Sequence, residues 1–127
     1  MDKPRVLKIL VVDDEEIVRH TIKMFLEYLG HNLHCEEDGL RGIRALENSK
    51  YDAAIVDVRM PGLDGIGFLS RAGETRPGMP VIVVSGHASP ETMEEALQAG
   101  AFAFLPKPFR LDELDGLLKR ICFLQES

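Results

Sequence analysis

The stretch Ile9-Leu10-Val11-Val12-Asp13-Asp14-Glu15 decides the fold, because four apolar residues without alternation run directly into acidic ones. Two later stretches have the same form. Residues 53–56 are apolar and precede Asp57, and residues 81–84 are apolar and precede Ser85. A strand that is apolar on both faces is typical of a parallel sheet covered by helices on both sides. These three stretches therefore predict the central strands of such a sheet.

Five apolar runs alternate with five segments of helical periodicity along the chain. The runs occupy residues 6–12, 33–35, 53–58, 81–84 and 102–105. The helical segments occupy residues 15–29, residues 111–121 and the stretches that follow the favoured N-caps Asp38, Asp64 and Ser89. Junctions between elements, where a positive φ is often required, contain Gly30, Gly39, Gly62, Gly86 and Gly100. The alternation predicts an α/β fold, a doubly wound parallel sheet of five strands with five helices.

Length and charge limit the possible functions. A chain of 127 residues fits one domain, which we expect to span residues 1–127. The net charge of −6, without a Lys/Arg cluster, argues against direct nucleic-acid binding and against binding to an anionic membrane. The apolar runs are too short for a transmembrane helix. Two cysteines, Cys35 and Cys122, suit a reducing compartment, so we expect a cytoplasmic protein with buried thiols.

Polar side chains follow four of the expected strands: Asp13 and Asp14, then Asp57, Ser85 and Lys107. Ligands of open α/β sheets bind beyond the carboxyl ends of the strands, where these side chains are expected to converge. Clustered carboxylates need a cation, and Mg²⁺ accepts a few carboxylates while it keeps several waters. A carboxylate can attack phosphorus to form an aspartyl phosphate, while lysine and serine stabilise phosphoryl oxygens. The set therefore predicts metal-assisted phosphoryl transfer onto an aspartate.

Four motifs make the chain resemble, essentially from end to end, the receiver domains of response regulators in two-component signalling. They are Leu10-Val11-Val12-Asp13-Asp14-Glu15, Asp57-Val58-Arg59-Met60-Pro61-Gly62-Leu63-Asp64-Gly65, Val84-Ser85-Gly86-His87 and Gly100-Ala101-Phe102-Ala103-Phe104-Leu105-Pro106-Lys107-Pro108-Phe109. Each motif closes an expected strand, and the four occur in the order and spacing of the family. The resemblance implies a flavodoxin-like sheet with the strand order 2-1-3-4-5.

The resemblance also implies a role for each matching residue. Asp57 is the expected phosphoacceptor and Lys107 the lysine that contacts the phosphoryl group. Asp13, Asp14 and Asp57 are the expected Mg²⁺ ligands, together with the backbone carbonyl of Arg59.

Four further expectations concern switching and tuning. Ser85 and Phe104 occupy the two switch positions, and many relatives have tyrosine in place of Phe104. Arg59 and His87, two residues beyond Asp57 and Ser85, are expected to tune the rim of the site. The Lys107–Pro108 bond is expected to be cis, against the general preference of X–Pro bonds for trans.

The implied partners are a sensor histidine kinase or a histidine phosphotransfer protein, which donates the phosphoryl group. The domain is then not a dedicated enzyme, although it catalyses its own phosphorylation and dephosphorylation. Its output is expected to reach a downstream effector domain or protein. The expected output face combines the helix of residues 90–99, the last strand and the helix of residues 111–121. The domain is compatible with the N-terminal part of a longer regulator.

Other interpretations stay open from sequence alone. The pair Asp13-Asp14 can cap the following helix, and Phe104 can be a core aromatic residue. A phosphatase of the haloacid-dehalogenase type is a second function, but it places Asp-x-Asp after its first strand. A flavodoxin-like cofactor module needs a phosphate-binding loop there, which the acidic residues 13–16 would oppose. A degenerate receiver is a further alternative, although the phosphorylation set is complete.

Overall fold

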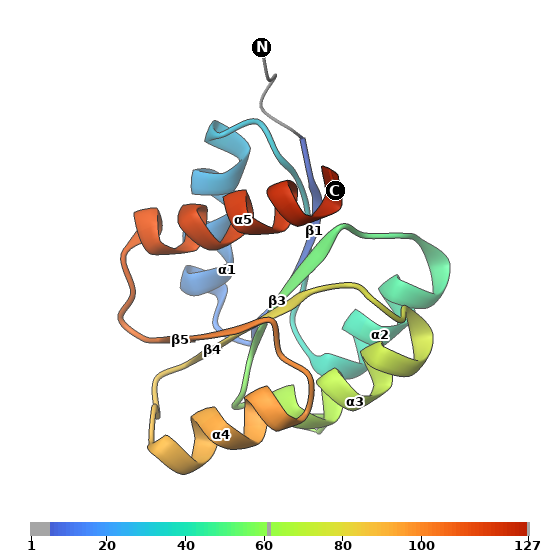
Figure 1. The fold of residues 1–127 in the computed structure, drawn as a ribbon, viewed down its shortest axis with the longest axis vertical. Coiled ribbons are helices and arrows are strands. Elements are labelled where there is room, and N and C mark those ends of the chain that lie inside the picture. Colours follow the sequence, from blue (N-terminus) through green and yellow to red (C-terminus); the bar gives the residue numbers. More distant parts are fainter. Residues whose placement is uncertain (1–5, 61, 127) are drawn as a thin grey trace.

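The structure, a computed structural model, describes residues 6–60 and 62–126 (Figure 1). Its strands are β1 (Lys8–Val12), β2 (Asn32–Glu36), β3 (Ala53–Asp57), β4 (Val81–Ser85) and β5 (Ala103–Pro106). Its helices are α1 (Glu16–Tyr28), α2 (Gly39–Asn48), α3 (Gly65–Thr75), α4 (Pro90–Gln98) and α5 (Leu111–Glu126). The strands are parallel in the order β2-β1-β3-β4-β5, which confirms the predicted fold class and strand order. Pro61 of the second motif lies outside the described residues.

Alternate residues of the central strands enter two separate hydrophobic clusters, one on each face of the sheet. On one face, Ile9 and Val11 of β1 pack with buried residues of α1 and α5. On the other face, Leu10 and Val12 pack with buried residues of α2, α3 and α4. Figure 1 shows the two groups of helices on opposite sides of the sheet. Because both faces are covered, residues 9–12, 53–56 and 81–84 of the central strands are all apolar.

Three helices begin with the predicted side-chain caps, Asp38, Asp64 and Ser89, whose oxygens accept the N–H groups of Arg41, Gly67 and Thr92. Helix α1 differs, because its N-cap is Glu15, which makes no side-chain cap hydrogen bond. The alternative in which Asp14 caps this helix is therefore wrong. The acidic residues before α1 need another explanation.

Several predictions of burial differ from the structure. Ile17, Leu40, Met93 and Leu97 are among the apolar residues whose helical spacing predicted the helices, but their side chains are exposed. Helix α4 buries only Ala96, since it packs near the edge strand β5, where little sheet surface needs cover. Cys35 and Cys122 are half-buried rather than fully buried. Among the described residues, no helix is long and apolar enough to cross a membrane.

The predicted junction glycines have two different roles. Gly30, Gly62 and Gly100 have a positive φ, as expected, whereas Gly39 and Gly86 do not. At Gly39 the requirement is space, because a Cβ atom there would collide with the main-chain oxygen of Leu63. The start of α2 therefore lies directly against the loop that leads from β3 to α3.

Candidate functional site

Two buried carboxylates lie side by side at the carboxyl edge of the sheet. Asp13 follows β1 and Asp57 ends β3, and the pairing of Val12 with Val56 brings the two strand ends to the same level. Asp13 is 1% exposed and Asp57 is 4% exposed. Burial of charged groups is unfavourable unless they are paired. These two side chains are therefore the first sign of a functional site in the fold.

Lys107 is the cation of this site and approaches from the loop after β5. Its ammonium donates to Asp57 Oδ2 at 2.5 Å and to Asp13 Oδ2 at 3.2 Å. Its backbone N–H donates to the carbonyl of Ser85 at 2.7 Å, which fixes the start of the loop to β4. The Lys107–Pro108 bond is cis, as the resemblance implied.

Burial and neighbouring charges shift the pKa of Asp13 and that of Lys107. Burial raises the pKa of Asp13 to about 6, and the neighbouring Asp57 charge adds to this effect. The Glu15 N–H and Lys107 favour the charged form of Asp13 but do not outweigh burial. Burial alone would lower the pKa of Lys107, but the hydrogen bonds and charges of Asp57 and Asp13 raise it overall. Lys107 therefore stays charged at neutral pH.

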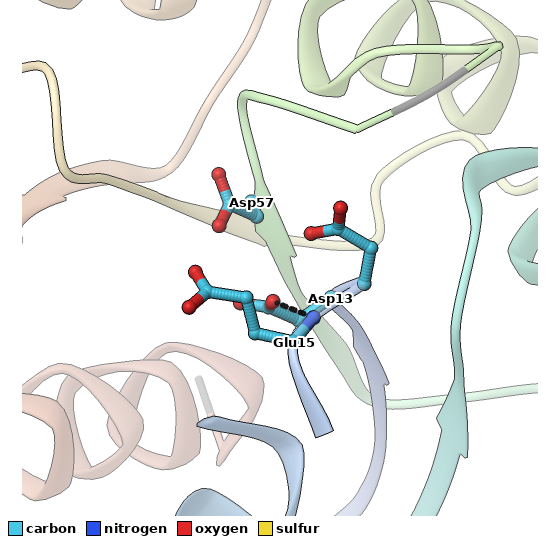
Figure 2. A group of neighbouring side chains, drawn as sticks. Asp13, Glu15 and Asp57 are labelled. Atoms are coloured by element: carbon cyan, nitrogen blue, oxygen red, sulfur yellow. Dashed lines mark hydrogen bonds between the residues drawn. The ribbon is translucent and has the colours of Figure 1, made fainter. Parts of the chain in front are cut away.

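A divalent cation fits the donor set of this edge. Carboxylate oxygens of Asp13, Asp14, Glu15 and Asp57 lie within 4.8 Å of one another. Figure 2 shows three of these side chains, Asp13, Glu15 and Asp57, gathered where β1 and β3 end. Only oxygen ligands are offered, and Asp14 and Glu15 are exposed to water. A hard cation such as Mg²⁺, which binds a few carboxylates and keeps several waters, suits this arrangement.

The other predicted site residues lie around this cluster at different depths. Ser85 is fully buried at the end of β4, and its hydroxyl accepts the N–H of the exposed His87 at 3.0 Å. Arg59 is exposed, but its backbone N–H donates to Asp57 Oδ1 at 2.8 Å. Phe104 on β5 is half-buried against the cluster beneath α2, α3 and α4. A switch in which Phe104 rotates into the core would therefore begin from a half-buried side chain rather than from an exposed one.

Three residues that support the site received no role from the sequence. Glu15 forms an ion pair with Lys107 at 3.5 Å. Arg19 of α1 donates to the carbonyl of Asp13 at 2.6 Å and holds the turn after β1. A Cβ atom on Gly65 would collide with the carbonyl of Asp57, so α3 starts directly against the end of β3. Glu15 had a sequence signal, since it extends the Asp13-Asp14 pair, and Gly65 ends the second motif, whereas Arg19 had no signal.

The family model of the response regulator receiver domain matches residues 9–119. The chain belongs to this family. Receiver domains are the regulated modules of two-component systems, and the family membership decides against the phosphatase and the cofactor module.

The chain is also 39% identical over 120 residues to the regulatory protein AtoC of Escherichia coli K12. It is 37% identical over 118 residues to a response regulator of Rickettsia felis described as NtrX-like.

The match covers 93% of this chain and 26% of AtoC, and 91% of this chain and 25% of the Rickettsia protein. The chain thus spans about a quarter of the length of these relatives.

Solved structures agree with this assignment. A CheY-like receiver domain from Methanospirillum hungatei has a TM-score of 0.89 and 30% identity, with 96% of this chain and 98% of that one covered. The receiver domain of the sensor histidine kinase PA1611 from Pseudomonas aeruginosa has a TM-score of 0.83 and 32% identity, with 91% and 97% covered. That structure has a magnesium ion coordinated in its active site cleft.

Proposed function

We propose that this receiver accepts a phosphoryl group on Asp57 from a phosphohistidine. The donor is a sensor histidine kinase or a histidine phosphotransfer protein. The observation that carries the proposal is the buried Asp57 carboxylate, which lies beside Asp13 and is bound by Lys107 at 2.5 Å. A carboxylate in this position serves as a nucleophile, while the neighbouring groups stabilise charge on the incoming phosphoryl oxygens.

In the proposed step, an oxygen of Asp57 forms a bond to phosphorus as the phosphorus–nitrogen bond of the donor breaks. The electron pair of the broken bond stays on the imidazole nitrogen, which a proton then neutralises. Lys107, which contacts Asp57 Oδ2 in the metal-free site, donates to a phosphoryl oxygen, and the Arg59 N–H keeps Asp57 Oδ1 oriented. When Mg²⁺ is bound by Asp13, Asp14 and Asp57, it neutralises charge on the carboxylates and the phosphoryl oxygens. The Arg59 carbonyl as a further ligand stays a prediction.

Because the receiver provides these catalytic groups itself, small acyl phosphates also serve as donors in this proposal. Water later attacks the phosphoaspartate, so the modification is reversible. The exposed side chains of Arg59 and His87 lie two residues beyond Asp57 and Ser85. We expect them to flank the path of this water and to change the lifetime of the phosphorylated state rather than its formation.

The proposed output passes through Ser85 and Phe104. A phosphoryl group adds charge and acceptor oxygens near the end of β4, where it draws the Ser85 hydroxyl away from the His87 N–H. Space then opens beside β5 for Phe104. Full burial of a phenylalanine is worth about 1.5–3 kcal/mol, and the half-buried Phe104 gains part of this. The face formed by α4, β5 and α5 changes shape and is recognised by an effector domain or protein.

Removal of the metal tests the proposed chemistry. We expect the protein to incorporate phosphate from acetyl phosphate in the presence of Mg²⁺ and to stop when EDTA is in excess, since the clustered carboxylates then repel the donor. Intact-protein mass spectrometry measures the phosphorylated fraction, and restored Mg²⁺ is the control. Undiminished phosphorylation in EDTA would contradict a metal-assisted step and would favour a different acceptor.

A further inference from the structure

Glu15 lies at the mouth of the site. It is the last residue of the first motif, but neither the family resemblance nor the proposed chemistry gives it a role. Its carboxylate oxygen is 3.5 Å from the Lys107 ammonium, as part of an ion pair. The same ammonium donates hydrogen bonds to Asp57 and Asp13, so three carboxylates share one cation. The Asp57 and Asp13 side chains are 6% and 1% exposed, whereas that of Glu15 is 64% exposed.

The local backbone explains how Glu15 reaches this position. Its N–H donates to Asp13 Oδ1 at 2.8 Å, marked by the dashed line in Figure 2, and this Asx turn bends the chain between β1 and α1. Glu15 is the N-cap residue of α1, a position that favours Ser, Thr, Asp or Asn. Its side chain makes no capping hydrogen bond. Helix capping therefore does not account for a glutamate here, and its side chain faces the site instead.

We propose that Glu15 is a positioning residue that keeps Lys107 at the mouth of the site while a divalent cation occupies the buried carboxylates. This inference rests on the Mg²⁺ site of the proposed function. When Asp13 and Asp57 become metal ligands, the metal competes with Lys107 for the same carboxylates and the two cations repel each other, so the contacts with Lys107 weaken. Glu15 offers the ammonium an anion on the solvent side. Lys107 thus leaves the metal ligands without losing its charge partner.

Magnesium affinity measured by isothermal titration calorimetry tests the proposal without any phosphorylation. Glu15→Gln should weaken Mg²⁺ binding about fivefold, because Lys107 then competes more strongly for Asp13 and Asp57. The matched control is Glu16→Gln, which removes the same charge one residue away, outside the carboxylate cluster. The control should leave the affinity within about twofold of the wild type, as expected for a solvated charge.

Two further variants distinguish the positioning of Lys107 by Glu15 from a general effect of the Glu15 charge on Mg²⁺ affinity. Glu15→Asp keeps the negative charge, but its shorter side chain holds the carboxylate farther from Lys107. This variant should therefore bind Mg²⁺ more weakly than the wild type. In a Lys107→Met background, Glu15→Gln should change the affinity less than about twofold, since no ammonium is left to hold. An equal loss in both backgrounds, or full affinity in Glu15→Asp, would overturn the positioning role.

The Mg²⁺ site and the role of Glu15 can be tested separately. A wild-type protein that does not bind Mg²⁺ would overturn the proposed function and this inference with it. A wild type that binds Mg²⁺ and a Glu15→Gln variant that binds it equally well would overturn this inference alone.

Discussion

Asp57→Asn is expected to abolish the Mg²⁺-dependent incorporation of phosphate from acetyl phosphate. The amide cannot act as a nucleophile toward phosphorus, whereas the carboxylate can. The substitution keeps the size of the side chain, and its oxygen can still accept the Arg59 N–H. The fold is therefore expected to persist while the chemistry is lost. Intact-protein mass spectrometry, with hydroxylamine treatment to release acyl phosphate, measures the result.

The matched control is Asp112→Asn, which removes one carboxylate from the exposed surface of α5. This variant should be phosphorylated to the same extent as the wild type. Hydroxylamine-labile phosphate in the Asp57→Asn protein at the wild-type level would mean that another residue is the acceptor. It would also leave the burial of Asp57 without a functional explanation.

Asp13→Asn is expected to stabilise the metal-free protein while it removes Mg²⁺ binding. Burial raises the pKa of Asp13 from 3.8 to about 6. Between these values the folded state binds more protons than the unfolded state, so stability falls as the pH rises through this window. Above it, the charged Asp13 weakens the fold. Because one pKa unit corresponds to about 1.4 kcal/mol, the variant should gain on the order of 3 kcal/mol in unfolding free energy.

Urea denaturation in EDTA at pH 7.5 measures this gain, and the same titration at pH 4 should show a much smaller difference. Added Mg²⁺ should stabilise the wild type by mass action and leave Asp13→Asn unchanged. Asn keeps an oxygen that accepts the Glu15 N–H, so the turn after β1 is retained. A variant that is less stable than the wild type in EDTA would show that the contact with Lys107 outweighs the burial of Asp13.

The sequence was sufficient to predict the sheet and the centre of the site for a simple physical reason. Apolar residues on both faces of β1, β3 and β4 require cover on both sides, which sets the architecture. The carboxyl ends of parallel strands meet at one edge, so Asp13, Asp57 and Lys107 had to lie close together. Asp57 is positioned by the backbone of β3 itself, and Asp13 and Lys107 are the first residues after β1 and β5.

The supporting contacts could not be predicted in the same way. Arg19 of α1 reaches the Asp13 carbonyl, and Gly39 of α2 leaves space for Leu63, which lies in the loop between β3 and α3. Both depend on how helices approach the sheet, which periodicity does not specify. The exposed Ile17 shows the same limit, because a 3.6-residue pattern identifies a helix without fixing the width of its buried face. Glu15 was visible as an acidic residue, but its pairing with Lys107 needed the Asx turn.

Borohydride trapping tests the central claim most directly, because it identifies the acceptor in the wild-type protein. Borohydride reduces a phosphoaspartate to homoserine, which tandem mass spectrometry locates in the peptide that contains it. After treatment with acetyl phosphate and Mg²⁺, we predict homoserine at position 57 and unmodified aspartate at positions 13 and 14. Homoserine at another position, or none at 57 in protein that carries phosphate, would contradict the account.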